Sequence, residues 1–236
     1  MKEIAPDARA FHELAAAADR LLAALDGLTD ADAAAPSRLP GWSRGHVLSH
    51  LAAQAPALER LLTWARTGVE TPQYASRAAR DAEIEAGTRL SADALVARVR
   101  QSAAHWQDAA ESLPEPAWDA TIRPFTGESC TPRRILVIRL RELVLHLVDL
   151  DLGHEIDGVP PHARDIVLAD VLGYYAHADG VPAFTLLDAE GARLARFGHG
   201  GPVVRGTRAA HLAWLSGRSD GAALAADELP DLPPWI

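Results

Sequence analysis

The stretch "LRELVLHLVDLDLG" (residues 140–153) has the composition of a buried helix, yet it carries Glu142 and His146 four residues apart. At 3.6 residues per turn, this spacing stacks the two side chains on one face of a helix. On a helical wheel with Glu142 at zero, His146 falls about 40° away and Asp149 about −20° away. The pattern fits either a solvated surface pair or a pair of side chains that faces a ligand.

The Glu142 face is not uniformly polar, which weakens the surface interpretation. Three apolar residues lie on or beside it: Ile135, Ile138 and Leu145. An earlier segment, "HVLSH", places His46 and His50 on a common helical face in the same way. If both mixed faces turn inward, imidazoles and a carboxylate meet inside a helical bundle, which is how metal sites in bundles are built.

Two histidines and one glutamate are a suitable ligand set for a divalent metal ion. Zinc takes imidazole nitrogen and carboxylate oxygen, and three protein ligands leave a fourth position open for water or substrate. A closed structural zinc site normally uses thiolates, and Cys130 is the single cysteine of the chain. By spacing alone, His46 and His50 are equal candidates for the ligand from the earlier segment.

The rest of the first 155 residues predicts a four-helix bundle, so the expected fold class is mainly α. Apolar residues at helical spacing favour a helix over 7–26, and Ser43 and Gly68 are suitable caps for a second. A third helix in two pieces and a fourth follow, over 77–86, 91–112 and 133–152. We therefore expect a metal-binding bundle over residues 1–155.

The pattern changes after residue 153, and residues 156–236 predict a small α+β domain. The Gly/Pro-rich segment 153–163 suits a linker, and a helix is expected near 164–178. Two β-prone runs flank "DAEG", which is typical of a hairpin, and "PVVRG" predicts a third strand. "TRAAHLAWLSG" predicts a closing amphipathic helix with Thr207 as its N-cap.

Composition narrows the classes of function. The formal net charge of −9 argues against a nucleic-acid-binding surface. No apolar run is long enough for a membrane span, and the N-terminus lacks the layout of a signal peptide. A single cysteine excludes an internal disulfide framework, so we expect a cytoplasmic protein.

Three segments together resemble the mycothiol-dependent maleylpyruvate isomerase family, within the DinB-like four-helix metalloenzymes. They are "LPGWSRGHVLSHLA" (39–52), "YASRAARDAEIEAG" (74–87) and "RELVLHLVDLDLG" (141–153). The tail from His211 to the C-terminus also resembles the small sterol-carrier-like domain of this family. The resemblance implies a DinB-like bundle followed by that small domain.

The resemblance also implies roles for particular residues. Zinc ligands in the family are one histidine of the second helix and a Glu-x-x-x-His pair of the fourth. On this sequence these are His50, Glu142 and His146, which leaves His46 as a neighbour. A catalytic arginine of the C-terminal domain corresponds to Arg218 in "SGRSDG".

The implied chemistry depends on zinc and on mycothiol as a thiol cofactor. A free thiol with a pKa of about 8.5 is mostly protonated at neutral pH, and coordination to zinc deprotonates it. The thiolate would add to the cis double bond of maleylpyruvate, the new single bond would rotate, and elimination would give fumarylpyruvate. Arginine binds carboxylates well, so Arg218, with Arg77 and Arg80 as weaker candidates, is expected to hold the substrate.

Two other interpretations remain open on the sequence. The same zinc–thiolate could serve a thiol S-transferase acting on another electrophile, because one site hosts several chemistries. A non-catalytic binding module, with solvated polar faces and solvated arginines, belongs to a different class. We expect a monomer or weak homodimer that binds small molecules and neither nucleic acid nor membranes.

Overall fold

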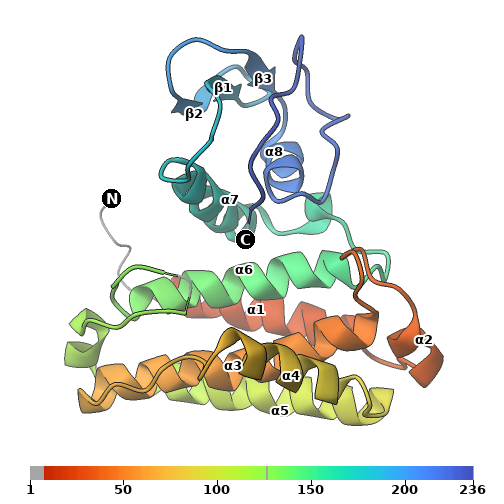
Figure 1. The fold of residues 1–236 in the computed structure, drawn as a ribbon, viewed down its shortest axis with the longest axis vertical. Helices are drawn as coiled ribbons and strands as arrows, with labels where there is room; N and C mark the ends of the chain where they lie inside the picture. Colours follow the sequence, from red (N-terminus) through yellow and green to blue (C-terminus); the bar gives the residue numbers. More distant parts are fainter. Residues whose placement is uncertain (1–7, 126, 236) are drawn as a thin grey trace. The chain divides into compact units, whose positions relative to one another are not determined.

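The computed structural model describes residues 8–125 and 127–235 and divides into two compact units, Met1–Gly153 and His154–Ile236 (Figure 1). The first unit consists of helices, and the second combines helices with a three-stranded sheet. This confirms the expected fold class, a mainly α protein with a small α+β part. In the described part of the chain, no helix combines the length and the apolar character needed to cross a membrane.

Four long helices form the bundle of the first unit (Figure 1). They are α1 (Ala8–Ala24), α3 (Arg44–Thr67), α5 (Ala92–Glu111) and α6 (Arg133–Asp149). Each buries a row of apolar side chains, and α3 is buried along most of its length because it contacts both α5 and α6. The first helix was expected from residue 7, and Asp7 lies outside the described residues.

Helix α3 begins and ends where its caps predict. The Ser43 hydroxyl accepts a hydrogen bond from the backbone N–H of His46, and Gly68 closes the helix with a left-handed φ of 71°. Pro56 lies inside the helix, which continues through it. The caps therefore set where the helix begins and ends, and His50 is one of its buried residues.

Shorter elements connect the bundle helices. Helix α4 (Arg77–Gly87) packs on α3, and the 3₁₀ turn η1 (Glu115–Asp119) follows α5 in the segment before α6. Helix α2 (Asp30–Ala34) was not predicted, because its single turn shows almost no helical periodicity. A capping box at Thr29 stabilises its single turn, in which the side chains and backbones of Thr29 and Asp32 bond reciprocally.

The second unit contains the expected hairpin and closing helix. Its elements are η2 (Ile156–Gly158), α7 (Pro161–Tyr175), β1 (Phe184–Leu187), β2 (Arg193–Phe197), β3 (Val203–Arg205) and α8 (Arg208–Leu215). Strand β1 is central, antiparallel to β2 and parallel to β3. Helix α7 begins earlier than expected, because Pro161 is a favourable first helical residue.

Candidate metal centre

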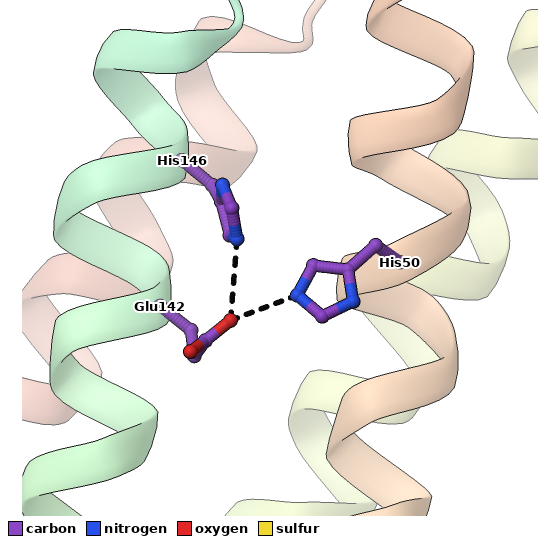
Figure 2. A group of neighbouring side chains, drawn as sticks. All are labelled: His50, Glu142 and His146. Carbon is purple, nitrogen blue, oxygen red and sulfur yellow. Dashed lines mark hydrogen bonds and ion pairs between the residues drawn. The ribbon is translucent and has the colours of Figure 1, made fainter. Parts of the chain in front are cut away.

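Helices α3 and α6 bring His50, Glu142 and His146 together inside the first unit (Figure 2). One potential ligand atom from each residue lies within 4.8 Å of the other two. The Glu142 Oε2 atom is 2.8 Å from His50 Nε2 and 3.2 Å from His146 Nε2. Three donor atoms from two helices therefore converge on one point.

Glu142 is ionised in this arrangement. Burial raises the pKa of its carboxyl group, but hydrogen bonds from His146 and His50 outweigh that effect and hold the pKa well below its ordinary range. Because a carboxylate only accepts hydrogen bonds, both imidazole Nε2 atoms carry a proton when they bond to it. A metal ion binding there would take the place of these protons, as expected for a site whose ligands must be deprotonated.

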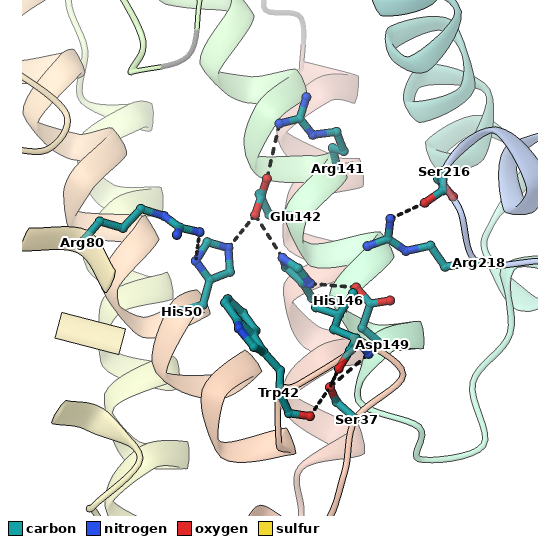
Figure 3. Close-up of polar contacts among 11 residues, drawn as sticks. Ser37, Trp42, His50, Arg80, Arg141, Glu142, His146, Asp149, Ser216 and Arg218 are labelled. Carbon is teal, nitrogen blue, oxygen red and sulfur yellow. Dashed lines mark hydrogen bonds and ion pairs between the residues drawn. The ribbon is translucent and has the colours of Figure 1, made fainter. Parts of the chain in front are cut away.

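Asp149 fixes the orientation of His146 (Figure 3). Its Oδ2 atom accepts a hydrogen bond of 2.8 Å from His146 Nδ1, and its side chain is 1% exposed. Burial lowers the pKa of His146, but the bonds to Asp149 and Glu142 outweigh it, and the pKa is raised. A carboxylate behind a ligand histidine holds the other ring nitrogen toward the metal.

His50 has a different environment from His146. Burial lowers its pKa more than the bond to Glu142 raises it, so the ring is neutral at neutral pH. With the proton on Nε2, Nδ1 is an acceptor, and Arg80 Nη2 approaches it at 3.5 Å (Figure 3). The Trp42 ring lies 5.8 Å from the His50 ring between centroids, so it forms an aromatic wall of the site.

Two further arginines lie beside Glu142 on α6, and neither was expected at the site from the sequence. Arg141 Nη2 donates to Glu142 Oε1 over 3.3 Å. Arg139 is 1% exposed and donates from Nη1 to Gln54 Oε1 over 2.7 Å. Burial lowers its pKa to about 10, so it remains charged at neutral pH. Their positions next to Glu142 on the same helix could have indicated that they belong to the site. Arginines on a helix are normally exposed to solvent, however, so the sequence did not favour that interpretation.

His46 is not part of this cluster. Its Nδ1 atom lies 2.8 Å from the Ser43 hydroxyl, and its Nε2 atom lies 3.3 Å from Glu85 Oε2. Its side chain is 24% exposed, compared with 7% for His50. The structure thus separates two histidines that spacing alone left equivalent.

The three arginines expected to bind substrate lie in different environments. Arg80 reaches His50 from α4, whereas Arg77 is exposed and lies over the Phe125 ring at 5.8 Å. Arg218 belongs to the second unit, where it donates to the Ser216 carbonyl over 2.6 Å and lies over the Trp235 ring at 5.7 Å. Of the three, Arg80 is the one that contacts a residue of the cluster within the first unit.

The residues present fit a divalent metal ion. Two imidazole nitrogens and one carboxylate oxygen suit zinc, the buried Asp149 supports one histidine, and Glu142 is already ionised. Three protein ligands leave a coordination position open, which is the arrangement of a catalytic rather than a structural zinc site.

Comparisons with known proteins show what this chain resembles. The family model described as the mycothiol maleylpyruvate isomerase N-terminal domain matches residues 14–151. Crystal structures of the mycothiol-dependent maleylpyruvate isomerase and of a histidine-to-alanine mutant of it superimpose with TM-scores of 0.87. Each shares 28% sequence identity, over 96% of this chain and 96% of the other. None of the curated proteins is significantly similar to this sequence.

Proposed function

This chain belongs to the mycothiol maleylpyruvate isomerase family, and from that premise we propose that it is a zinc- and mycothiol-dependent isomerase. Its reaction would convert maleylpyruvate to fumarylpyruvate by the addition, rotation and elimination described above. The relatives named for this activity match over almost the whole chain, including the second unit.

The observation that carries the proposal is the convergence of His50, Glu142 and His146 on one point. The three side chains are largely buried, which argues against the alternative that Glu142 and His146 are a solvated pair on the surface. We assign the three residues as ligands of one zinc ion. When bound, zinc would lower the pKa of the cofactor thiol and so provide a thiolate at neutral pH.

The residues around the ligands have supporting roles. Asp149 holds His146 Nδ1, which would leave Nε2 to bind the metal. The guanidinium groups of Arg80 and Arg141 keep positive charge beside His50 and Glu142, which favours an anionic substrate. Arg77 remains a weaker candidate for binding the substrate.

Arg218 is proposed as the catalytic arginine, on the family resemblance. An arginine can hold a substrate carboxylate or stabilise the negative charge that develops during addition. Arg218→Ala should keep the metal and the fold but lose about 10²-fold or more in turnover, and Arg218→Lys should recover only part. Steady-state kinetics with metal analysis tests this. Near-normal turnover of Arg218→Ala would leave the carboxylate to Arg80 or Arg77.

The activity itself is tested by following maleylpyruvate turnover by the purified, zinc-loaded protein with and without mycothiol. We expect conversion to fumarylpyruvate that requires mycothiol and is lost after chelation of the metal. Absence of turnover, together with consumption of the thiol on other electrophiles, would favour an S-transferase. Turnover that persists without mycothiol would contradict the proposal.

A further inference from the structure

A second buried polar layer lies one helical turn from the proposed metal ligands. Gln54 follows His50 by four residues on α3, and Arg139 precedes Glu142 by three residues on α6. These spacings place each of the two polar residues on the same helix face as its neighbouring ligand. Arg139 Nη1 donates to Gln54 Oε1 over 2.7 Å, so this layer connects the same two helices as the ligands do.

Arg139 carries its charge into the interior of the bundle. The residue is 1% exposed, and it donates to the neutral amide of Gln54 rather than to a carboxylate. Its guanidinium lies over the Trp106 ring, 5.8 to 6 Å being the usual outer limit of such a contact and 5.9 Å the value here. Among the residues that the structure describes, its Nη2 atom has no hydrogen-bond partner. A buried charge held in this way lowers stability, so its presence calls for a functional reason.

The charge of Arg139 acts on the metal centre through Glu142. Residues three apart on a helix have Cβ atoms about 5–6 Å from each other, and the Glu142 carboxylate favours the charged form of Arg139. Solvent screens a buried charge much less than an exposed one, so the attraction reaches across the interior. The field of Arg139 therefore extends to the point at which the three ligand atoms converge.

From this arrangement we propose that Arg139 sets the charge preference of the metal centre. Its buried guanidinium strengthens the binding of anionic ligands at the open coordination position and weakens the binding of the metal ion itself. Arg139 touches neither the metal nor the ligand, so it is a specificity-determining residue that acts through its charge. The inference rests on the proposed function for the metal ion at His50, Glu142 and His146.

A purely structural role for Arg139 makes the opposite prediction for the metal. If the residue only ties α6 to α3 through Gln54, its loss should loosen the ligand set and weaken the binding of metal and of anions together. If its charge is what matters, its loss removes a repulsion from the metal and an attraction for anions. Metal binding then becomes tighter while anion binding becomes weaker.

The test measures two affinities of the full-length protein rather than turnover. Zinc affinity is measured by competition with a chromophoric chelator, and azide is titrated into the cobalt-loaded protein and followed by its visible spectrum. Imidazole serves as the uncharged probe in the same titration. Arg139→Gln removes the charge but keeps an amide donor for Gln54, and Arg139→Lys keeps the charge. Arg139→Met is a second uncharged variant, since apolar replacements of buried charges are often tolerated.

We expect Arg139→Gln and Arg139→Met each to bind zinc about tenfold more tightly and azide about threefold more weakly than the unmodified protein. The two changes are related, because a divalent ion feels twice the effect of a single charge and tenfold is about the square of threefold. Arg139→Lys should bind zinc and azide like the unmodified protein, and the affinity for imidazole should not change in any variant.

Weaker or unchanged zinc binding in both uncharged variants would overturn the proposal, because the charge of Arg139 would then not oppose the metal. An equal loss of azide binding in Arg139→Lys and Arg139→Gln would also overturn it. The shape of the arginine, rather than its charge, would in that case control the open position.

The outcome is separate from that of the proposed reaction. If the uncharged variants show the two opposite changes but the unmodified protein does not isomerise maleylpyruvate, the role of Arg139 stands and the assigned reaction fails. If the protein isomerises maleylpyruvate with mycothiol but Arg139→Gln binds zinc and azide normally, the reaction stands and the role of Arg139 is wrong.

Discussion

At the scale of single residues, the site depends on how each imidazole is held. His146 is bonded on both nitrogens by carboxylates, whereas His50 has a carboxylate on Nε2 and a guanidinium near Nδ1. The pKa of His146 is consequently raised and that of His50 is lowered, although both side chains are largely buried. The two proposed ligands are therefore prepared for a metal by different neighbours.

Asp149→Asn should reduce zinc affinity about 10- to 100-fold, the usual effect of losing a carboxylate behind a ligand histidine. An amide carbonyl can still accept from Nδ1, but it lacks the charge that raises the basicity of the ring. Competition with a chromophoric chelator measures the change.

The control for this prediction is Asp151→Asn, two residues further along the chain. Asp151 pairs with Arg38 at 2.9 Å and its side chain is 50% exposed, so its replacement should leave zinc affinity unchanged. Equal affinities for the two variants would mean that Asp149 does not support the metal centre.

At the scale of elements, the sequence predicted those parts of the fold that depend on local signals. Ser43 and Gly68 delimit α3, Thr207 begins α8, and "DAEG" joins β1 to β2. Local signals do not specify pairing between distant strands, so the parallel alignment of β1 with β3 could not be predicted. The single turn of α2 was missed because a five-residue helix has almost no periodicity to detect.

The same limit explains which residues of the site were found. Glu142 and His146 share one helix, so their spacing is visible in the sequence. The partner from α3 required a choice between His46 and His50, which periodicity could not make and the family resemblance did. Arg139 lies on α6 three residues before Glu142, but its burial depends on how separate segments pack together, as does the nearness of Tyr74 to Glu142. No local pattern indicates such packing.

Gly87 sets the approach of α4 to α3. A Cβ atom at this position would clash with the Ser49 hydroxyl and lie 2.8 Å from the Ser49 Cβ atom. That hydroxyl also donates to the Ile84 carbonyl over 2.8 Å. Gly87→Ala should therefore lower the free energy of unfolding by about 1–3 kcal/mol, the range for overpacking a tight contact.

Chemical denaturation measures this change, and Gly173→Ala is the matched control. Gly173 lies inside α7, and a Cβ atom there would meet no atom within 4 Å. The same substitution should stabilise the protein at this position by about 0.5–1 kcal/mol, because alanine restricts the unfolded chain. Destabilisation of similar size at both positions would contradict the assigned contact between α4 and α3.

Helix α8 buries a titratable group, His211, inside the second unit. The residue is 0% exposed, and its Nε2–H donates to the Leu187 carbonyl over 2.8 Å. Within the part of the chain that the structure describes, its Nδ1 atom has no hydrogen-bond partner. Burial lowers the pKa of His211 more than the bond to Leu187 and the charge of Asp188 raise it.

A histidine with a lowered folded-state pKa binds its proton more readily in the unfolded chain. Its contribution to stability is present above the unfolded value of 6.5 and is lost as the pH falls through that value toward the lower folded pKa. His211→Gln keeps an N–H donor but cannot titrate, so its Tm should fall less than that of the unmodified protein between about pH 7.5 and about pH 5.5. Circular dichroism melts at both pH values test this, and parallel losses in the two proteins would remove His211 as the cause.

At the scale of the whole molecule, the chain is divided into two units with different contents. The first unit contains the three proposed zinc ligands and Asp149, whereas the second contains Arg218. Metal binding is therefore expected to depend on residues of the first unit alone. Turnover is expected to require both units.

The metal content of the purified full-length protein tests the central claim most directly. Measured by elemental mass spectrometry after zinc loading and desalting, the unmodified protein should hold about one equivalent of zinc, as should His46→Ala. His50→Ala, Glu142→Ala and His146→Ala should each retain less than about a tenth of that amount. If the unmodified protein holds no zinc, or if His46→Ala loses as much as His50→Ala, the metal centre is not the one described.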